Sequence, residues 1–184
     1  MATAATELRP HPAHPAAAIR RFDAAAEWPA SGSPLRIRFR IDGDVGQLRL
    51  PPPGVARRHD GLWQHSCFEA FLRPDASDIY YEFNFAPSGD WAAYRFAGRR
   101  GMRSSPELAA PAIRTSLLAE RYELTAEIDV AAVPELAQAG TIRAGLTAVV
   151  ESDSGALSYW ALAHGGDGPD FHDPATFLLR VTRR

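Results

Sequence analysis

Two acidic residues, Glu69 and Glu82, lie in neighbouring segments, 67–72 and 79–85, which a polar loop separates. If these segments pair as an antiparallel hairpin, their apolar residues share one face, and both carboxylates lie on the other face beside Asn84. Paired carboxylates can hydrolyse a glycosidic bond, because one acid protonates the leaving oxygen while the other acts as nucleophile or base. One hypothesis is therefore an enzyme that acts on a sugar through Glu69 and Glu82.

The same two carboxylates also have a structural interpretation. Guanidinium groups match carboxylates in bidentate pairs, and a lattice of such pairs connects neighbouring strands without any ligand. The arginines that we expect to face Glu69 and Glu82 are Arg36, Arg38, Arg40 and Arg95. This ionic lattice is compatible with ligand binding at the same face.

The segment 164–173 gathers two histidines and three aspartates within ten residues. Its spacing matches neither an EF-hand loop nor a zinc-binding HExxH helix. Asp and Gly are also ordinary turn residues, so we expect a hydrogen-bonded structural loop and no metal or other cofactor. Structural calcium in this loop is the alternative.

Cys67 is the only cysteine, so neither an intramolecular disulfide nor a cysteine-based zinc cluster can form. It follows His65 and Ser66, but adjacent strand residues point to opposite faces and are poorly placed to act as nucleophile and base. We expect Cys67 to be a small buried hydrophobic residue.

Most of the chain alternates polar and apolar residues with a period of two, which is typical of half-buried strands. We expect strands at 37–41, 47–50, 67–72, 79–85, 91–96, 122–130, 142–150, 157–163 and 176–181, and a short helix at 133–139. Residues 1–18 are rich in Ala, Pro and His without a period, and we expect them to be a loosely ordered lead-in. The sequence thus predicts one all-β domain, 19–184, built as an antiparallel β-sandwich with one or two short helical segments.

Composition excludes several classes of function. The 184 residues suffice for one globular core, and all 20 basic residues are Arg, which excludes a P-loop lysine and a pyridoxal-phosphate Schiff base. The net charge of −2 provides no field for nucleic acid or anionic membranes. Residues 1–19 lack the apolar core of a signal peptide, and no stretch resembles a membrane-spanning helix. We therefore expect a cytoplasmic protein without nucleic-acid or membrane partners.

Four stretches carry a resemblance to a known group of proteins. They read DGLWQHSCFEAF at 60–71, YYEFNFAPSGDWAAY at 80–94, YWALAH at 159–164 and PDFH at 169–172. This pattern resembles the DOMON-like group, which is related to family 9 carbohydrate-binding modules, and the similarity extends over residues 8–182. The resemblance implies a β-sandwich of jelly-roll type that binds a sugar or haem, and it places this chain beside bacterial standalone members of uncharacterised specificity.

Of the two ligands that the resemblance implies, the residues favour a sugar. Haem requires Met or His axial ligands, and Met102, the only internal methionine, has no identifiable partner ligand. A sugar site requires aromatic plates for the C–H face and polar groups for the hydroxyls. The candidate ligand-binding residues are Trp63, Glu69, Glu82, Asn84, Trp91, Arg95, Trp160 and His172. Burial of the tryptophans in the core is the alternative for each of them.

We therefore expect a noncatalytic β-sandwich domain that binds a small saccharide or a sugar-containing metabolite. Two alternatives remain open at this point. One is the sugar-active enzyme that uses Glu69 and Glu82, and the other is a protein-interaction or assembly module. In the assembly module, the ligand face would contact a partner or a second copy in a homo-oligomer.

Overall fold

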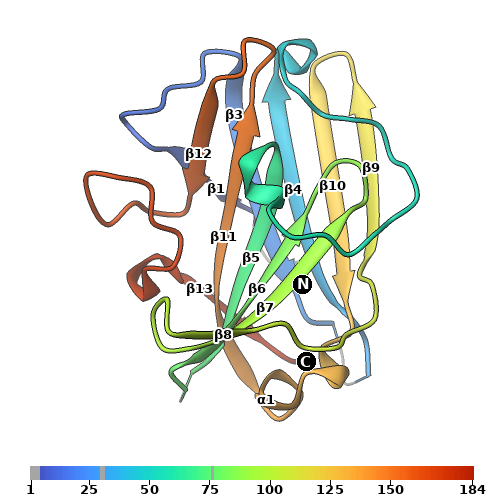
Figure 1. Ribbon diagram of the computed structural model, residues 1–184, viewed down its shortest axis with the longest axis vertical. Helices are drawn as coiled ribbons and strands as arrows, with labels where there is room; N and C mark the ends of the chain where they lie inside the picture. The colour runs from blue at the N-terminus through green and yellow to red at the C-terminus, as the bar shows by residue number, and fades with distance from the viewer. Residues whose placement is uncertain (1–4, 30–31, 76) are drawn as a thin grey trace.

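Two antiparallel β-sheets stack face to face in the computed structural model, which describes residues 5–29, 32–75 and 77–184 (Figure 1). The small sheet has the order β1-β3-β4-β10-β9, and its strands are β1 (Thr6–Glu7), β3 (Ile19–Glu27), β4 (Leu35–Gly43), β10 (Arg121–Ile128) and β9 (Ala112–Leu118). The large sheet has the order β2-β12-β11-β5-β6-β7-β8, and β13 also pairs with β11. Its strands are β2 (Arg9–Pro10), β12 (Leu157–Ala161), β11 (Thr141–Glu151), β5 (Cys67–Pro74), β6 (Ile79–Phe85), β7 (Trp91–Ala97), β8 (Met102–Ser104) and β13 (Leu179–Thr182). The predicted all-β sandwich is confirmed.

Alternation of side chains along the strands builds the core between the sheets. In β4, Ile37, Phe39 and Ile41 are fully buried, and the arginines between them point outward. Aromatic rings connect the two sheets, since Phe39 lies 5.3 Å from Phe68 and Phe22 lies 5.4 Å from Trp160 between ring centroids. Burial of this apolar face provides the main stabilisation of the sandwich.

The hairpin of β5 and β6 has the register that the sequence predicts. Phe68 pairs with Phe85, and Glu69 pairs with Asn84. Because successive strand residues point to opposite faces, the phenylalanines enter the core between the sheets. Glu69, Glu82 and Asn84 therefore share the outer face of the large sheet.

The predicted lattice between arginines and the two carboxylates is wrong. Arg36, Arg38 and Arg40 project from the outer face of the small sheet, on the opposite side of the sandwich from Glu69 and Glu82. Two of them pair with other acids there: Arg36 contacts Glu127 at 2.9 Å, and Arg40 contacts Asp42 at 2.9 Å. Arg95 lies on the core-facing side of β7 and contacts Glu135 at 2.7 Å.

Several elements differ from the predicted ones. Residues 47–50 form no strand, because Val45–Gln47 is a 3-10 turn and three prolines without N–H groups follow. Leu48 makes a single bridge to Ser152. The predicted lead-in contributes two edge strands, β1 and β2, and Leu8 between them is buried.

The short predicted helix is present as α1 (Pro134–Ala137), while β3, β8 and β9 were not predicted. Four 3-10 turns complete the described elements: η1 (Val45–Gln47), η2 (Leu62–Gln64), η3 (Val130–Ala132) and η4 (Pro174–Thr176). No helix in the described part of the chain is long and apolar enough to cross a membrane.

A second apolar cluster lies on the outer face of the large sheet, where two connections cover it. These connections contain η2 before β5 and the segment 162–178 between β12 and β13, and they bury Leu62, Phe171 and Phe177 against the sheet. Phe177 approaches the backbone of β11 at Gly145, where an added Cβ would lie 2.7 Å from its ring. The absence of a side chain at Gly145 thus allows the segment 162–178 to dock.

Gly145→Ala is therefore expected to destabilise the protein by about 1–3 kcal/mol, because the methyl group overlaps the Phe177 ring and displaces it. Urea denaturation measures this change. Gly140→Ala, just before the same strand, is the matched control, since nothing lies within 4 Å of the added Cβ. Equal stability of the two variants would show that Phe177 does not pack as described.

Candidate functional site

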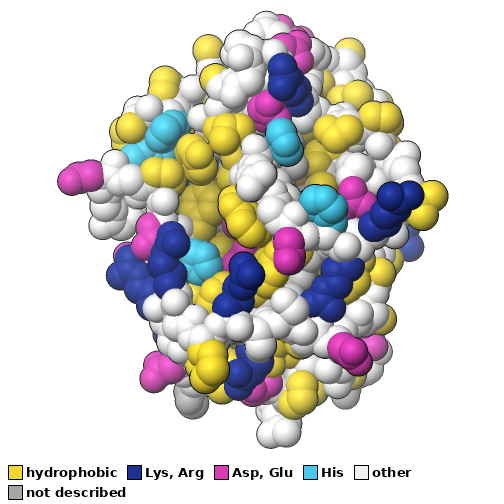
Figure 2. All heavy atoms as spheres, viewed as in Figure 1, with side chains coloured by type: hydrophobic (Ala, Val, Ile, Leu, Met, Phe, Trp, Pro, Cys, Tyr) yellow, Lys and Arg dark blue, Asp and Glu magenta, His cyan; other side chains and the backbone are white. Residues whose placement is uncertain are grey.

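A pocket of about 450 Å³ opens on the outer face of the large sheet. Figure 2 shows this face with a hollow whose visible wall is mostly hydrophobic, and with arginine and histidine side chains around it. Six strands, the turn between β7 and β8, and both covering connections supply its lining. The lining residues are Trp63, Glu69, Phe71, Glu82, Tyr94, Phe96, Arg100, Gly101, Arg103, Val149, Tyr159, Pro169, Phe171 and His172.

Two buried carboxyl groups form the polar floor of this pocket. Glu69 is 3% exposed and Glu82 is 5% exposed. The Asn84 amide donates to Glu82 Oε1 at 2.8 Å, and the Thr147 hydroxyl donates to Glu69 Oε2 at 3.5 Å. Within the described residues, neither carboxyl forms an ion pair with an arginine.

Burial shifts the pKa of both floor carboxyls upward. Loss of hydration raises the pKa of Glu82 to about 7, although the hydrogen bond from Asn84 and the charges of Arg103 and Arg100 oppose the shift. For Glu69, loss of hydration and then the charge of Glu82 raise the pKa well above its usual range. The two carboxyls lie on paired strands and repel each other when both are ionised, so the empty pocket retains a proton near neutral pH.

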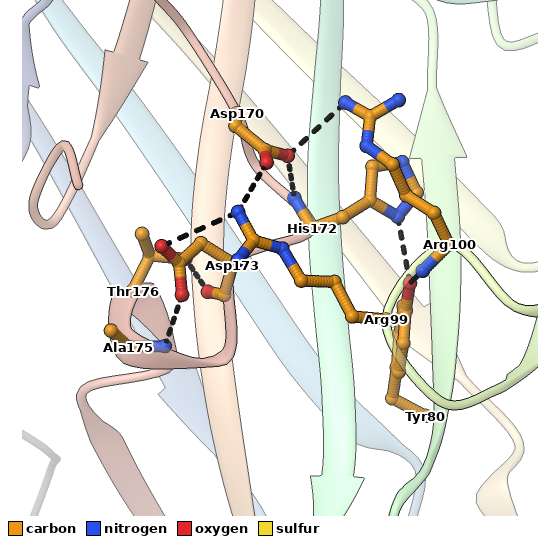
Figure 3. A network of polar contacts seen from close by, with 8 residues as sticks. All are labelled: Tyr80, Arg99, Arg100, Asp170, His172, Asp173, Ala175 and Thr176. Atoms are coloured by element: carbon orange, nitrogen blue, oxygen red, sulfur yellow. Dashed lines mark hydrogen bonds and ion pairs between the residues drawn. The ribbon is translucent and has the colours of Figure 1, made fainter. Parts of the chain in front are cut away.

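His172, in the segment 162–178, lines the pocket and lies beside Tyr80 and Arg100 (Figure 3). The Tyr80 hydroxyl accepts a hydrogen bond from the Arg100 backbone N–H at 3.3 Å and lies 2.8 Å from His172 Nδ1. Loss of hydration lowers the pKa of His172 to about 4, so the ring is neutral. The Tyr80 hydroxyl and Nδ1 form a hydrogen bond, and Nε2 of the same ring lies 3.7 Å from Glu82 Oε2.

Ion pairs hold the wall that carries His172 against the turn between β7 and β8 (Figure 3). Arg99 contacts Asp170 at 2.6 Å and Asp173 at 3.6 Å, and Arg100 contacts Asp170 at 3.1 Å. Asp170 also accepts the backbone N–H of His172 at 3.0 Å. The two chain segments, distant in sequence, are thereby joined beside the pocket.

Aromatic side chains form the remaining walls. Trp63, in η2, is 39% exposed, and its ring lies edge-on to Tyr94 with 6.2 Å between centroids. The Tyr94 hydroxyl donates to Asp60 at 2.7 Å, and the Arg103 guanidinium lies 4.9 Å from its ring centroid. The ring centroids of Tyr159 and Phe171 lie 6.2 Å apart. The pocket thus combines exposed ring surface with buried acid groups.

The structure brings four of the eight candidate residues together in this pocket: Trp63, Glu69, Glu82 and His172. A fifth, Asn84, lies behind the lining and holds Glu82 in place. Two tryptophans lie in the core between the sheets, where Trp91 is 5% exposed and Trp160 is 4% exposed. Arg95 also lies outside the lining, because it is on the core-facing side of β7, where it contacts Glu135.

Sequence reasoning missed several lining residues, chiefly Tyr94, Phe96, Tyr159 and Phe171. The signal for two of them was present, since Tyr94 and Phe96 have the opposite parity to Trp91 along β7. Glu82 pairs with Tyr94 across the strands, so the parity of Glu82 already assigns Tyr94 to the same face.

A second cleft, of about 650 Å³, lies on the other side of η2 and includes His65 and Glu151. Glu151 is buried like the floor carboxyls, but Arg49 contacts it at 2.7 Å and His65 at 2.8 Å. No group of three or more His, Cys, Asp or Glu side chains in the described ranges is arranged to hold a metal ion. The outer pocket therefore remains the better candidate site.

Comparisons with known proteins find similarity in structure and not in sequence. No family model matches the chain, and no curated protein matches it in sequence. The crystal structure of a candidate carbohydrate-binding protein from Bacteroides uniformis is similar to it, with a TM-score of 0.62, 17% identity, and coverage of 96% of this chain and 86% of that one.

Two structures of a family 9 carbohydrate-binding module from Caldicellulosiruptor kristjanssonii are also similar, each with 12% identity. The complex with glucose has a TM-score of 0.51 and covers 88% of this chain and 75% of that one. The complex with cellotriose has a TM-score of 0.52 and covers 96% of this chain and 82% of that one. At these identities, the likeness establishes a shared fold.

The raised pKa of Glu82 predicts a specific dependence of stability on pH. Folded Glu82 keeps a proton that the unfolded chain releases between about pH 4.5 and 7, so the free energy of unfolding falls as the pH rises through this window. The shift from 4.5 to about 7 corresponds to about 3 kcal/mol. Glu82→Gln should reduce this slope, while the remaining Glu69 continues to contribute.

Urea denaturation at a series of pH values measures the slope. Glu107→Gln is the matched control, since Glu107 is exposed outside the pocket and its loss should leave the slope unchanged. Equal slopes for the wild type and Glu82→Gln would contradict a protonated floor.

Proposed function

We propose that the outer pocket binds a saccharide and releases it unchanged. The observation that carries this proposal is the combination in one pocket of exposed aromatic surface with two buried carboxyl groups. The volume of about 450 Å³ lies in the range of small-molecule sites. A sugar matches both parts, because its C–H faces are apolar and its hydroxyls donate and accept hydrogen bonds.

The aromatic walls account for the apolar part of recognition. Trp63 has a partly free ring, and Tyr159 and Phe171 line the pocket from β12 and the segment 162–178. A sugar ring that packs against these side chains removes apolar surface from water without ordering a flexible side chain.

The floor accounts for the polar part. Glu69 and Glu82 present oxygens that accept hydrogen bonds from sugar hydroxyls, and in the protonated state one carboxyl also donates. Asn84 and Thr147 already hold these groups, so little conformational entropy is lost on binding. Hydrogen bonds within a buried pocket favour ligands that match the floor and penalise those that leave an oxygen unpaired.

The structural neighbours support the same proposal. The family 9 modules from Caldicellulosiruptor kristjanssonii were solved with glucose and with cellotriose, and they share this fold. We also propose that this chain belongs to the DOMON-like group, because the motif residues Trp63, Glu69, Glu82 and His172 line one pocket.

Trp63→Ala should weaken saccharide binding at least about tenfold, equivalent to about 1.4 kcal/mol, because it removes a wall of the pocket. The melting temperature should change little, since this side chain is 39% exposed and lies outside the inter-sheet core. Titration calorimetry with glucose and cellotriose measures the affinity. Leu117→Ala, an exposed residue of β9 in the small sheet, is the matched control and should bind as the wild type does.

An unchanged affinity in Trp63→Ala would place binding elsewhere, and the absence of binding to any saccharide in a broad panel would overturn the proposal. Chromatography of cellotriose after long incubation separates binding from catalysis. Recovery of intact cellotriose is the expected result, whereas cleavage that is lost in both Glu69→Gln and Glu82→Gln would favour the enzyme.

A further inference from the structure

We propose that the saccharide carries an amine, which the pocket binds as an ammonium group between Glu69 and Glu82. This inference rests on the proposed function and specifies its ligand class. It follows from the way in which the floor carboxyls differ from the other acidic groups of the chain.

The floor carboxyls have no cation within contact. The two other buried acids in the described residues each pair with an arginine: Glu151 contacts Arg49 at 2.7 Å, and Asp23 contacts Arg21 at 2.7 Å. A carboxylate without a counter-ion in a buried site is costly, since neither water nor a positive charge replaces its lost hydration. Glu69 and Glu82 are therefore placed as the acidic side of an ion pair, which a cation from the ligand can complete.

One oxygen of the floor is open to a ligand. Glu69 is 3% exposed and lines the pocket, and the Thr147 hydroxyl reaches only its Oε2, at 3.5 Å. No hydrogen bond from the described part of the chain reaches Oε1. An oxygen that lines the pocket without a donor from the described residues can accept a hydrogen bond from the ligand.

The positive groups nearest the floor are engaged elsewhere. Arg100 contacts Asp170 at 3.1 Å, and the Arg103 guanidinium lies over the Tyr94 ring. His172 is neutral and directs Nε2 toward Glu82 at 3.7 Å, beyond hydrogen-bond distance. None of these three groups forms an ion pair with the two carboxyls, so a ligand can supply the missing charge.

The walls also favour a cation. Phe71 and Phe96 line the pocket with Tyr94, whose ring already lies 4.9 Å from the Arg103 guanidinium, and the faces of aromatic rings carry negative potential that attracts positive charge. An ammonium group offers three donors, compared with one from a hydroxyl, and its charge replaces the proton that the empty pair retains. Replacing one sugar hydroxyl with an amine should therefore change the binding free energy at the carboxyl pair more than at the rest of the pocket.

Binding of an ammonium group should release a proton from the carboxyl pair into the buffer. Near pH 6 the empty pair is largely protonated, and the bound cation stabilises its ionised form. The titratable and charged groups that face the pair come from β5, β6, β7, the β7–β8 turn, β8 and the segment 162–178: Cys67, Tyr80, Tyr94, Arg100, Arg103, Asp170 and His172. Of these groups, His172 has the pKa nearest to 6, and its value of about 4 keeps the ring neutral at this pH.

The test compares each amino sugar with its neutral parent by titration calorimetry at about pH 6. Glucosamine, galactosamine and mannosamine are paired with glucose, galactose and mannose, and N-acetylglucosamine serves as the uncharged amide. At least one amine should bind about tenfold or more tightly than its parent, equivalent to about 1.4 kcal/mol, and N-acetylation should abolish the preference. Titrations in buffers of different ionisation enthalpy should show proton release for the amine and not for the parent.

Glu69→Gln and Glu82→Gln should each weaken binding of the amine more than binding of its neutral parent, so that the ratio of the two affinities falls. Glu107→Gln is the control, and far-ultraviolet circular dichroism confirms that each variant is folded. If parents bind at least as tightly as every amine, or if the preference survives both floor variants, this inference is overturned and the proposed function stands. If no sugar of either kind binds, both fail.

Discussion

A carboxylate that leaves water loses hydration that only hydrogen bonds, a counter-ion or a proton can replace. Glu69 and Glu82 meet this constraint on the outer face of the large sheet, where Asn84 and Thr147 supply hydrogen bonds and a retained proton lowers the charge. The sandwich core offsets the remaining cost, because the opposite faces of the same strands bury phenylalanines between the sheets. The pocket and the core thus lie on the two opposite faces of the same strands.

The covering connections determine how far this acidic floor is removed from water. Phe177 packs over Gly145, and Asp170 joins the same connection to Arg99 and Arg100. These contacts place His172 above Glu82, with a ring that is itself too buried to carry charge. Because His172 above the floor is neutral, a charged group of the ligand can supply the counter-ion for the carboxyl pair. The structure therefore points to the polar group of the sugar and not to its ring.

Local alternation explains what the sequence predicts well. The parity of residues in β5 and β6 places Glu69 and Glu82 on one face, because a shift of one residue would expose Phe68 and Phe85. The same parity excludes Trp91 and Trp160 from the pocket, although their residue type suggested sugar plates. Phe171 depends instead on the docking of a long connection, which is a tertiary contact without a periodic signal. The partner of Arg36 depends on strand order, which places Glu127 of β10 beside β4.

The protonation of the carboxyl pair is the central claim, and carbon-13 NMR of the Glu69 and Glu82 side-chain carboxyl groups measures it directly. In the empty protein, we expect Glu82 to titrate at about 7 and Glu69 to titrate well above its usual range. Saturation with an amino sugar should lower both midpoints, since the ammonium group stabilises the ionised forms. Midpoints near 4.5 for both groups in the empty protein would contradict the account, because the floor would then be ionised and accessible to water.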